Sequence, residues 1–390
     1  MDAFTRQIEI PKYSRMVPLS EIGDPKNDYN LNIPRYIDSS EAEDLQDIEA
    51  HLKGGIPNAD LEALASYWKV FPTLQQQLFE NGGRPGYSQI KVEPAKIKPT
   101  IFRHPEFTAY TATVKGLFSV WQTANTPRLK GIEKGAHPKQ LIEQISEDIL
   151  QAFAKVKLID PYDVYQHLMS SWTDTMQDDV YMVATDGWTA LAEGKPNTDL
   201  IPPPLIIARY FAEEQANSEK LEAESEAIKS EMEEMDEEHG GEEGLLFEAK
   251  TEKGKLTKAS VNARLKEIKQ DKEALEERKA LEAYLALIEK EAAANKKVKD
   301  AQKALNKEVE AQYAKLTQYE VRTLVVDDKW LANLAVDVQT ELDRVSQALT
   351  GRIKTLAERY TTPLPKLTEE VETLSARVDE HLKRMGFAWK

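Results

Sequence analysis

Apolar residues recur every three or four positions along most of this 390-residue chain, which is the spacing of one face of an α-helix. This pattern predicts helices over 41–52, 58–71, 106–124, 138–156, 161–176, 333–360 and 366–385. A proline near the start of the fourth and fifth ranges suits the first turn of a helix. We therefore expect a mainly α protein.

Short β elements are expected near the N-terminus. Glycine and proline at 82–86 indicate a turn, and 87–92 follows as a possible strand. Residues 27–38, NDYNLNIPRYID, combine helix-breaking residues with roughly alternating apolar positions, so this segment should run extended between turns. Farther along, 323–326 (Thr-Leu-Val-Val) is either a short strand or the buried start of a helix.

A long antiparallel coiled-coil arm is predicted in the middle of the chain. The proline run at 201–204 cannot lie inside a helix, and the composition shifts there from aromatic-rich to Ala, Glu, Lys and Leu. Leu221, Ile228 and Met235 are seven residues apart with Met232 between them, as in a heptad seam. Glycines then interrupt the pattern before a second helical stretch over 258–316.

These patterns divide the chain into four parts. We expect an extended arm over 1–38, a helical domain with a small β element over 39–200, the coiled-coil arm over 201–318 and a C-terminal helical segment over 319–390.

The composition excludes several classes of site. Without cysteine, the chain has no disulfide, thiolate zinc site or cysteine nucleophile. It has no run of 18 apolar residues and no secretory leader pattern, so we expect a soluble cytoplasmic protein without a membrane span.

The charge balance argues against DNA binding through the overall field of the protein, because the net charge is -16. Residues 213–243 hold fourteen acidic residues against two lysines, which accounts for -12 of that total. The rest of the chain is close to neutral, so a local basic face outside 213–243 is not excluded by the net charge. The residues of this face are Arg84, Tyr87, Lys91, Lys96, Lys98, Phe102 and Arg103. They either contact the phosphates of DNA or belong to ordinary solvent-exposed surface.

Acidic groups raise the question of a metal site. Asp174, Asp178 and Asp179 have carboxylates that suit Mg²⁺, but a solvated helix end or partner-facing surface is the preferred interpretation. The run 327–329, Asp-Asp-Lys, lacks the spacing of a nuclease site, and a turn with helix-capping aspartates is the preferred interpretation. His167 lies on an apolar helical face, which favours a core or interface histidine.

Several strings resemble the C-terminal half of the modification (M) subunit of type I restriction-modification DNA adenine methyltransferases. The strings are KYSR (12–15), NDYNLNIPRYID (27–38), GGIPNADLEALASYWKVFP (54–72), IFRHPEFTAY (101–110), YDVYQHLMSSWTDTMQDDVY (162–181), LVVDDKWL (324–331) and ELDRVSQALTGRIKTLAERYTTPLP (341–365). The resemblance spans essentially the whole chain.

The resemblance implies a subunit of an adenine N6 methylation complex. It implies assembly with the specificity (S) subunit and with the catalytic half of the M subunit, contact with the restriction (R) subunit indirectly, and DNA clamping through the complex. S-adenosylmethionine is implied for the complete M subunit, and no cofactor for this chain.

The chain departs from the family pattern because it holds no Asn/Asp-Pro-Pro-Phe/Tyr motif and no glycine-rich turn between strand and helix. It begins just before KYSR, so we expect a split or truncated subunit that is inactive alone, without catalytic or metal-binding residues of its own. We expect 163–179 and the terminal helices to form the interface. The candidate partner or DNA-contacting residues are Asn30, Asn32, Arg35, Tyr36, Tyr162, Tyr165, His167, Trp172, Asp178, Asp179, Arg344 and Arg352.

Two other classes of protein also remain open for this sequence. The first is a free-standing coiled-coil scaffold or regulatory protein. The second is a metal-dependent nuclease that uses Asp327 and Asp328.

Overall fold

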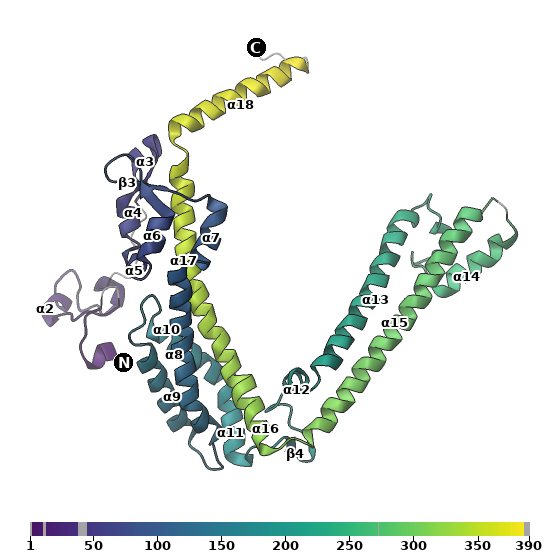
Figure 1. Cartoon of the computed structure of the whole chain (residues 1–390), viewed down its shortest axis with the longest axis horizontal. Helices are drawn as coiled ribbons and strands as arrows, with labels where there is room; N and C mark the ends of the chain where they lie inside the picture. The colour runs from purple at the N-terminus through teal and green to yellow at the C-terminus, as the bar shows by residue number, and fades with distance from the viewer. Residues whose placement is uncertain (1, 11–12, 38–44, 272, 386–390) are drawn as a thin grey trace. The chain divides into compact units, whose positions relative to one another are not determined.

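The computed structural model describes residues 2–10, 13–37, 45–271 and 273–385, most of which are helical (Figure 1). The predicted mainly α fold is confirmed, with short strands near the N-terminus, an antiparallel helical arm and long C-terminal helices. No helix in these ranges is long and apolar enough to cross a lipid bilayer. The chain divides into two compact units: the first takes in Met1–Ala63, Phe79–Pro94 and Lys354–Lys390, and the second Leu64–Leu78 and Ala95–Ile353.

The first unit surrounds a three-stranded antiparallel sheet of order β1-β3-β2. Ile56 of β1 lies opposite Ser88 of β3, and Phe79 of β2 lies opposite Ile90. The elements are α1 (Asp2–Thr5), α2 (Leu19–Ile22), η1 (Ile33–Arg35), α3 (Ile48–Lys53), β1 (Ile56–Pro57), α4 (Asn58–Glu62), β2 (Phe79–Asn81), β3 (Tyr87–Ile90), the final residues of α17 (Ala332–Thr361) and α18 (Leu364–Arg384).

Polar contacts fix α3 against this sheet. Asp47 begins the helix by accepting a hydrogen bond from the Ala50 amide at 2.8 Å, and its other oxygen accepts from the Tyr87 hydroxyl at 3.1 Å. The Arg84 guanidinium lies over the Tyr87 ring, 3.4 Å from its centre, and donates to the carbonyl of Gly54. Gly54 ends α3 with a φ of 76°, which favours glycine because it lacks a Cβ atom.

The second unit is a helical body that continues into a two-helix hairpin. Its elements are α5 (Ala65–Trp68), α6 (Pro72–Leu78), α7 (Pro94–Phe102, from Ala95 onward), α8 (Pro105–Lys130), α9 (Pro138–Phe153), α10 (Pro161–Ser171), η2 (Trp172–Met176), α11 (Gln177–Asp186), β4 (Leu191–Ala192), β5 (Lys195–Pro196), α12 (Pro203–Tyr210), α13 (Ala212–His239), η3 (Phe247–Ala249), α14 (Lys258–Glu267), η4 (Ile268–Gln270), α15 (Leu275–Tyr313), α16 (Gln318–Arg322), η5 (Thr323–Leu331) and the first part of α17.

The core of this body contains aromatic residues whose polar atoms are satisfied. The buried Trp121 donates through its indole N–H to the carbonyl of Ile145 at 3.1 Å, and Trp188 donates to that of Ile132 at 2.7 Å. The Tyr313 hydroxyl donates to a carbonyl beside the proline run, that of Ile201, at 2.5 Å. Because each buried donor has an acceptor, these large side chains fill the core without an unpaired polar group.

The hairpin is formed by α13 and α15, which lie side by side (Figure 1). Leu221, Ile228, Met232 and Met235 are half-buried while most residues between them are exposed, as the heptad spacing predicts. At its far end a small second core gathers residues of α14, α15 and the intervening turns. Its buried members are Leu246, Ala249, Val261, Ile268, Ala280, Leu281 and Tyr284.

Several local predictions are corrected by the structure. Residues 27–37 do not form one extended run: 27–29 lie in a turn, where Asp28 and Tyr29 have positive φ angles, and Ile33–Arg35 form the 3₁₀ turn η1. Between them, Asn32 is extended. In the predicted helix over 41–52, residues 45–47 are not helical and α3 begins at Ile48. Residues 41–44, like Lys12 and Asp38 of the quoted strings, lie outside the described residues. The range 58–71 contains two short helices, α4 and α5, instead of one.

The second long helical pattern is also interrupted. The predicted helix over 258–316 is broken between η4 and α15. Asp271 accepts a hydrogen bond from the Glu273 amide at 2.9 Å, and such a local turn competes with continuation of a helix. The break lets Val261 and Ile268 pack with Leu281 in the small second core.

Candidate functional site

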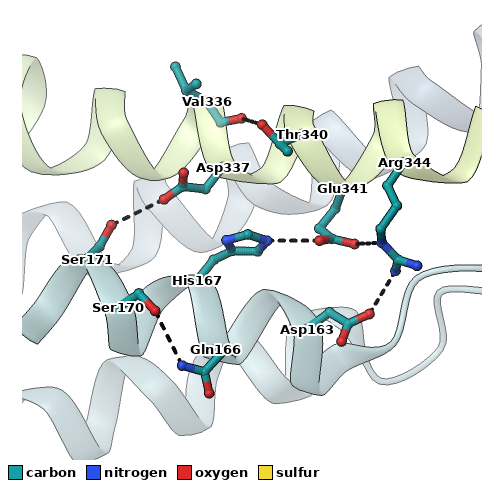
Figure 2. Close-up of polar contacts among 10 residues, drawn as sticks. All are labelled: Asp163, Gln166, His167, Ser170, Ser171, Val336, Asp337, Thr340, Glu341 and Arg344. Carbon is teal, nitrogen blue, oxygen red and sulfur yellow. Dashed lines mark hydrogen bonds and ion pairs between the residues drawn. The ribbon is translucent and has the colours of Figure 1, made fainter. Parts of the chain in front are cut away.

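A network of four polar side chains connects α10 to α17, and two of them, His167 and Arg344, are predicted site residues (Figure 2). The His167 Nε2 atom lies 2.9 Å from one oxygen of Glu341, and Arg344 donates through Nε to the other oxygen at 2.7 Å. Arg344 also donates to Asp163 at 2.8 Å. The sequence places these residues on two helices more than 150 positions apart, and the fold brings them into one hydrogen-bonded chain.

Glu341 is the buried centre of this network. Burial alone would raise the pKa of its carboxyl, but hydrogen bonds from His167 and Arg344 outweigh burial and hold the pKa below its ordinary value. In return, the hydrogen bond to Glu341 raises the pKa of Arg344. Ser171 adds a contact farther along, where its hydroxyl donates to Asp337 at 3.3 Å (Figure 2).

The other candidates from the same part of the sequence differ in exposure. The Tyr162 side chain is exposed, whereas Tyr165 is half-buried and its ring centre lies 6.5 Å from that of Tyr162. Trp172 is buried in the core, and Arg352 is half-buried on α17. Tyr162 is therefore the most accessible of these four side chains.

Asp179 is buried and holds a second network. It accepts hydrogen bonds from the Trp330 indole N–H at 2.7 Å and from the Lys329 ammonium at 3.0 Å. The same ammonium donates to the carbonyls of Asp199 and Leu200. Burial raises the pKa of Asp179, and the two side-chain donors act against that rise.

The surroundings of Asp179 do not favour a magnesium site formed with Asp174 and Asp178. Its carboxylate is occupied by a lysine and a tryptophan, while Asp174 and Asp178 are exposed. Within the described ranges, no group of three or more His, Asp or Glu side chains is arranged to hold a metal ion.

The aspartates at 327 and 328 do not cap a helix, which corrects that prediction. Both lie inside the π-helical segment η5, where Asp327 pairs with Lys130 at 2.5 Å and Asp328 accepts from Arg209 at 2.7 and 2.9 Å. The run 323–326 belongs to the same segment, so the strand alternative is wrong. The wider turn of a π-helix sends these neighbouring carboxylates to α8 and α12.

The N-terminal candidates belong to the first unit and not to the unit that contains the two networks. Asn30, Asn32 and Arg35 are exposed, and Tyr36 is half-buried. The Tyr36 hydroxyl donates to the Asn30 carbonyl at 2.5 Å, and Arg35 donates to the carbonyl of Lys26 at 2.9 Å. These contacts define a locally folded segment.

That segment exposes apolar side chains beside its polar candidates. Tyr29, Leu31 and Ile33 are each about two-thirds or more exposed, at 67%, 72% and 67%. Each of these side chains would be removed from water if another chain covered the segment.

The proposed basic face is divided between the two units. Arg84 and Tyr87 stack on each other in the first unit, and Arg84 also pairs with Glu49 at 2.9 Å. In the second unit, the Lys98 ammonium lies 5.5 Å from the centre of the Phe102 ring. Lys91, in the first unit, and Lys96 and Arg103, in the second, are exposed.

An exposed apolar stripe lies on α18, a helix that holds none of the predicted site residues. Leu364, Leu367, Val371, Leu374 and Val378 are 44–61% exposed. No side chain of this 21-residue helix is buried. The alternating spacing of three and four residues was the signal in the sequence that pointed to this face.

No protein-family model, curated protein or solved structure matches this chain.

The buried Asp179–Lys329 pair and the more exposed Arg209–Asp328 pair allow a matched test of ion-pair burial. Lys329→Met is expected to lower the free energy of unfolding by about 3 kcal/mol, because Asp179 would stay buried without its ammonium partner. Arg209→Met should cost below about 1 kcal/mol, since its side chain is 39% exposed and that of Asp328 31%. Urea denaturation of both variants measures the difference, and equal losses would contradict this account.

The Glu341 network makes stability depend on pH. Because folding lowers the pKa of Glu341, its stabilising contribution is present above the ordinary pKa of 4.5 and is lost as pH falls through the lower folded value. Glu341→Gln should therefore reduce the free energy of unfolding by about 1–2 kcal/mol at pH 7 and by progressively less below pH 4.5.

Denaturation curves of the wild type and of Glu341→Gln, recorded from pH 7 down to pH 3.5, test this dependence. Glu358→Gln, at an exposed position of the same helix, removes the same charge and serves as the control for a simple change of net charge. A difference between wild type and Glu341→Gln that stays constant with pH would show that ionisation of Glu341 is not the cause.

Proposed function

We propose that this chain is the non-catalytic assembly region of a type I M subunit, and that it binds the S subunit through α18. The observation that carries this proposal is the apolar stripe of α18, which is exposed from Leu364 to Val378. The resemblance of the sequence strings to the family supplies the identity of the partner.

The length of α18 and the spacing of its apolar residues favour a helical partner. A helix of 21 residues is about 31 Å long, and α18 carries apolar residues at five successive a and d positions from Leu364 to Val378. An isolated helix of this size is only marginally stable in water, and burying its apolar face against other helices adds the missing stability. Helices with this spacing bind partner helices or apolar grooves.

The N-terminal segment supports a second contact, with the catalytic half of the M subunit. Its exposed Tyr29, Leu31 and Ile33 form an apolar surface on the first unit. Asn30, Asn32 and Arg35 are exposed among them and would supply polar contacts at the edge of such an interface.

DNA would be held by the assembled complex, because a net charge of -16 opposes direct binding to phosphates by this chain. The R subunit would be reached indirectly, and S-adenosylmethionine would be bound by the catalytic half. Such a complex modifies cellular DNA, so we place the chain in the cytoplasm.

A free-standing scaffold is the second candidate, and the hairpin of α13 and α15 favours it. Two long helices joined by a compact end provide a spacer that needs no catalytic partner. Purification of this chain with an M-subunit catalytic half and an S subunit separates the two candidates, because a scaffold would not join that complex.

The α18 interface predicts a face-specific loss of S-subunit binding. Leu374→Glu should weaken binding at least about tenfold, because it places a charge within the apolar stripe. Thr373→Glu adds the same charge one position away on the exposed polar side and should leave binding nearly unchanged.

Pull-down from co-expressed chains and titration calorimetry measure this difference. Circular dichroism checks that both variants keep their helix content. If Leu374→Glu binds the S subunit as well as Thr373→Glu does, α18 is not the interface.

The absence of cofactor motifs from these 390 residues predicts that the chain alone gives no heat in calorimetry with S-adenosylmethionine. The co-purified complex with a catalytic half should give a binding signal under the same conditions. Micromolar binding by the chain alone would overturn the proposal that it is non-catalytic.

A further inference from the structure

Charge is distributed unevenly along α18. From 364 to 374 the helix carries Glu369, Glu370 and Glu372 against Lys366, which gives -2. From 375 to 385 the cations are Arg377, Lys383 and Arg384, and the anions are Asp379 and Glu380, which gives +1 with histidine neutral. One end of the helix is therefore acidic and the other is basic.

Two of these charges lie directly beside the apolar stripe. In a heptad frame with Leu364, Val371 and Val378 at a, the d positions are 367, 374 and 381. Glu370 and Arg377 are then both g residues, which flank the seam between paired helices. Both are exposed on the helix.

We infer that α18 pairs antiparallel with α18 of a second copy of this chain. In this arrangement Val371 lies opposite Leu374 of the second copy, and Leu367 lies opposite Val378. The outermost layer at each end pairs Leu364 with His381, so the apolar seam is the central four layers. Each acidic half then faces a basic half, and Glu370 lies beside Arg377 of the second copy twice, by symmetry. The apolar stripe and the flanking charges favour the same register.

Other arrangements lose this complementarity. In a parallel pair each acidic half faces an acidic half, and the g residue Glu370 lies beside Ser375 of the second copy rather than beside a cation. An antiparallel register shifted by one heptad toward the C-terminus brings Arg377 beside Arg377. The opposite shift brings Glu370 beside Glu370. Like charges at these positions destabilise a pair.

Self-pairing would also regulate assembly with the S subunit, and this part of the inference rests on the proposed function. The self-paired helices cover the same apolar face that the S subunit would occupy, so the free chain protects its own interface until a partner displaces the second copy. The pairing itself concerns this chain alone and does not depend on S-subunit binding.

Charge reversal in the full-length chain tests the pairing. Glu370→Arg and Arg377→Glu each replace two attractive contacts by two repulsive ones, and each should weaken dimerisation about tenfold or more. An equimolar mixture of the two variants should restore dimers, because one variant then carries two arginines and the other two glutamates. Glu369→Arg is the matched control, since the same substitution one residue away points from the seam.

Sedimentation velocity over a range of concentrations gives the dimer fraction, and circular dichroism confirms that each variant keeps its helices. A wild-type chain that stays monomeric at high micromolar concentration overturns the inference. So does a dimer that responds equally to Glu370→Arg and Glu369→Arg, or a mixture of the two charge variants that fails to associate.

S-subunit binding by the Glu370→Arg variant separates the two proposals. If the variant is monomeric and does not bind the S subunit, while the wild type also fails to bind, the proposed function is wrong and self-pairing stands. If the S subunit binds the wild type but no charge-dependent dimer forms, self-pairing is wrong and the proposed function stands.

Discussion

The helical body depends on the buried ion pair between Asp179 and Lys329, which joins α11 to the π-helical segment η5. A buried carboxylate without partners would cost several kcal/mol, and here an ammonium and the indole of Trp330 satisfy it. Because the next residues back along η5 pair with Lys130 and Arg209, one short segment contacts α8, α11 and α12. The π-helical turn makes this possible by spreading consecutive side chains over a wider arc than an α-helix allows.

The hairpin of α13 and α15 is held by a different balance of forces. Its seam contains few large apolar residues, and Ser225 donates to Asn295 across it at 2.9 Å. The acidic helix α13 packs against a part of α15, 290–307, that holds six lysines and only two acidic residues. The opposite charges favour the pairing, and the contacts from Ser225 to Asn295 and from Gln302 to Glu222 fix the register. The small apolar core at the far end closes the pair.

Periodicity in the sequence was sufficient to predict the long helices and the arm, because their apolar residues form one stripe along each helix. The protein buries most of these stripes and exposes that of α18. Periodicity failed where contacts between distant helices determine the backbone conformation. Nothing local in 323–331 distinguishes a strand, a helix start or a capped turn, since the partners Lys130, Asp179 and Arg209 come from distant helices. The pairing of His167 with Glu341 was equally hidden by a separation of 174 residues. By contrast, the face of α18 was readable from spacing alone.

The exposure of α18 also bears on how long an unassembled chain survives. A helix that buries none of its side chains is held mainly by its own backbone hydrogen bonds, so it unfolds locally far more often than the helices of the core. Each local unfolding event offers a protease an extended substrate. Any chain that covers α18 reduces the frequency of such events, and protein turnover would then become a measure of how much of the population is assembled.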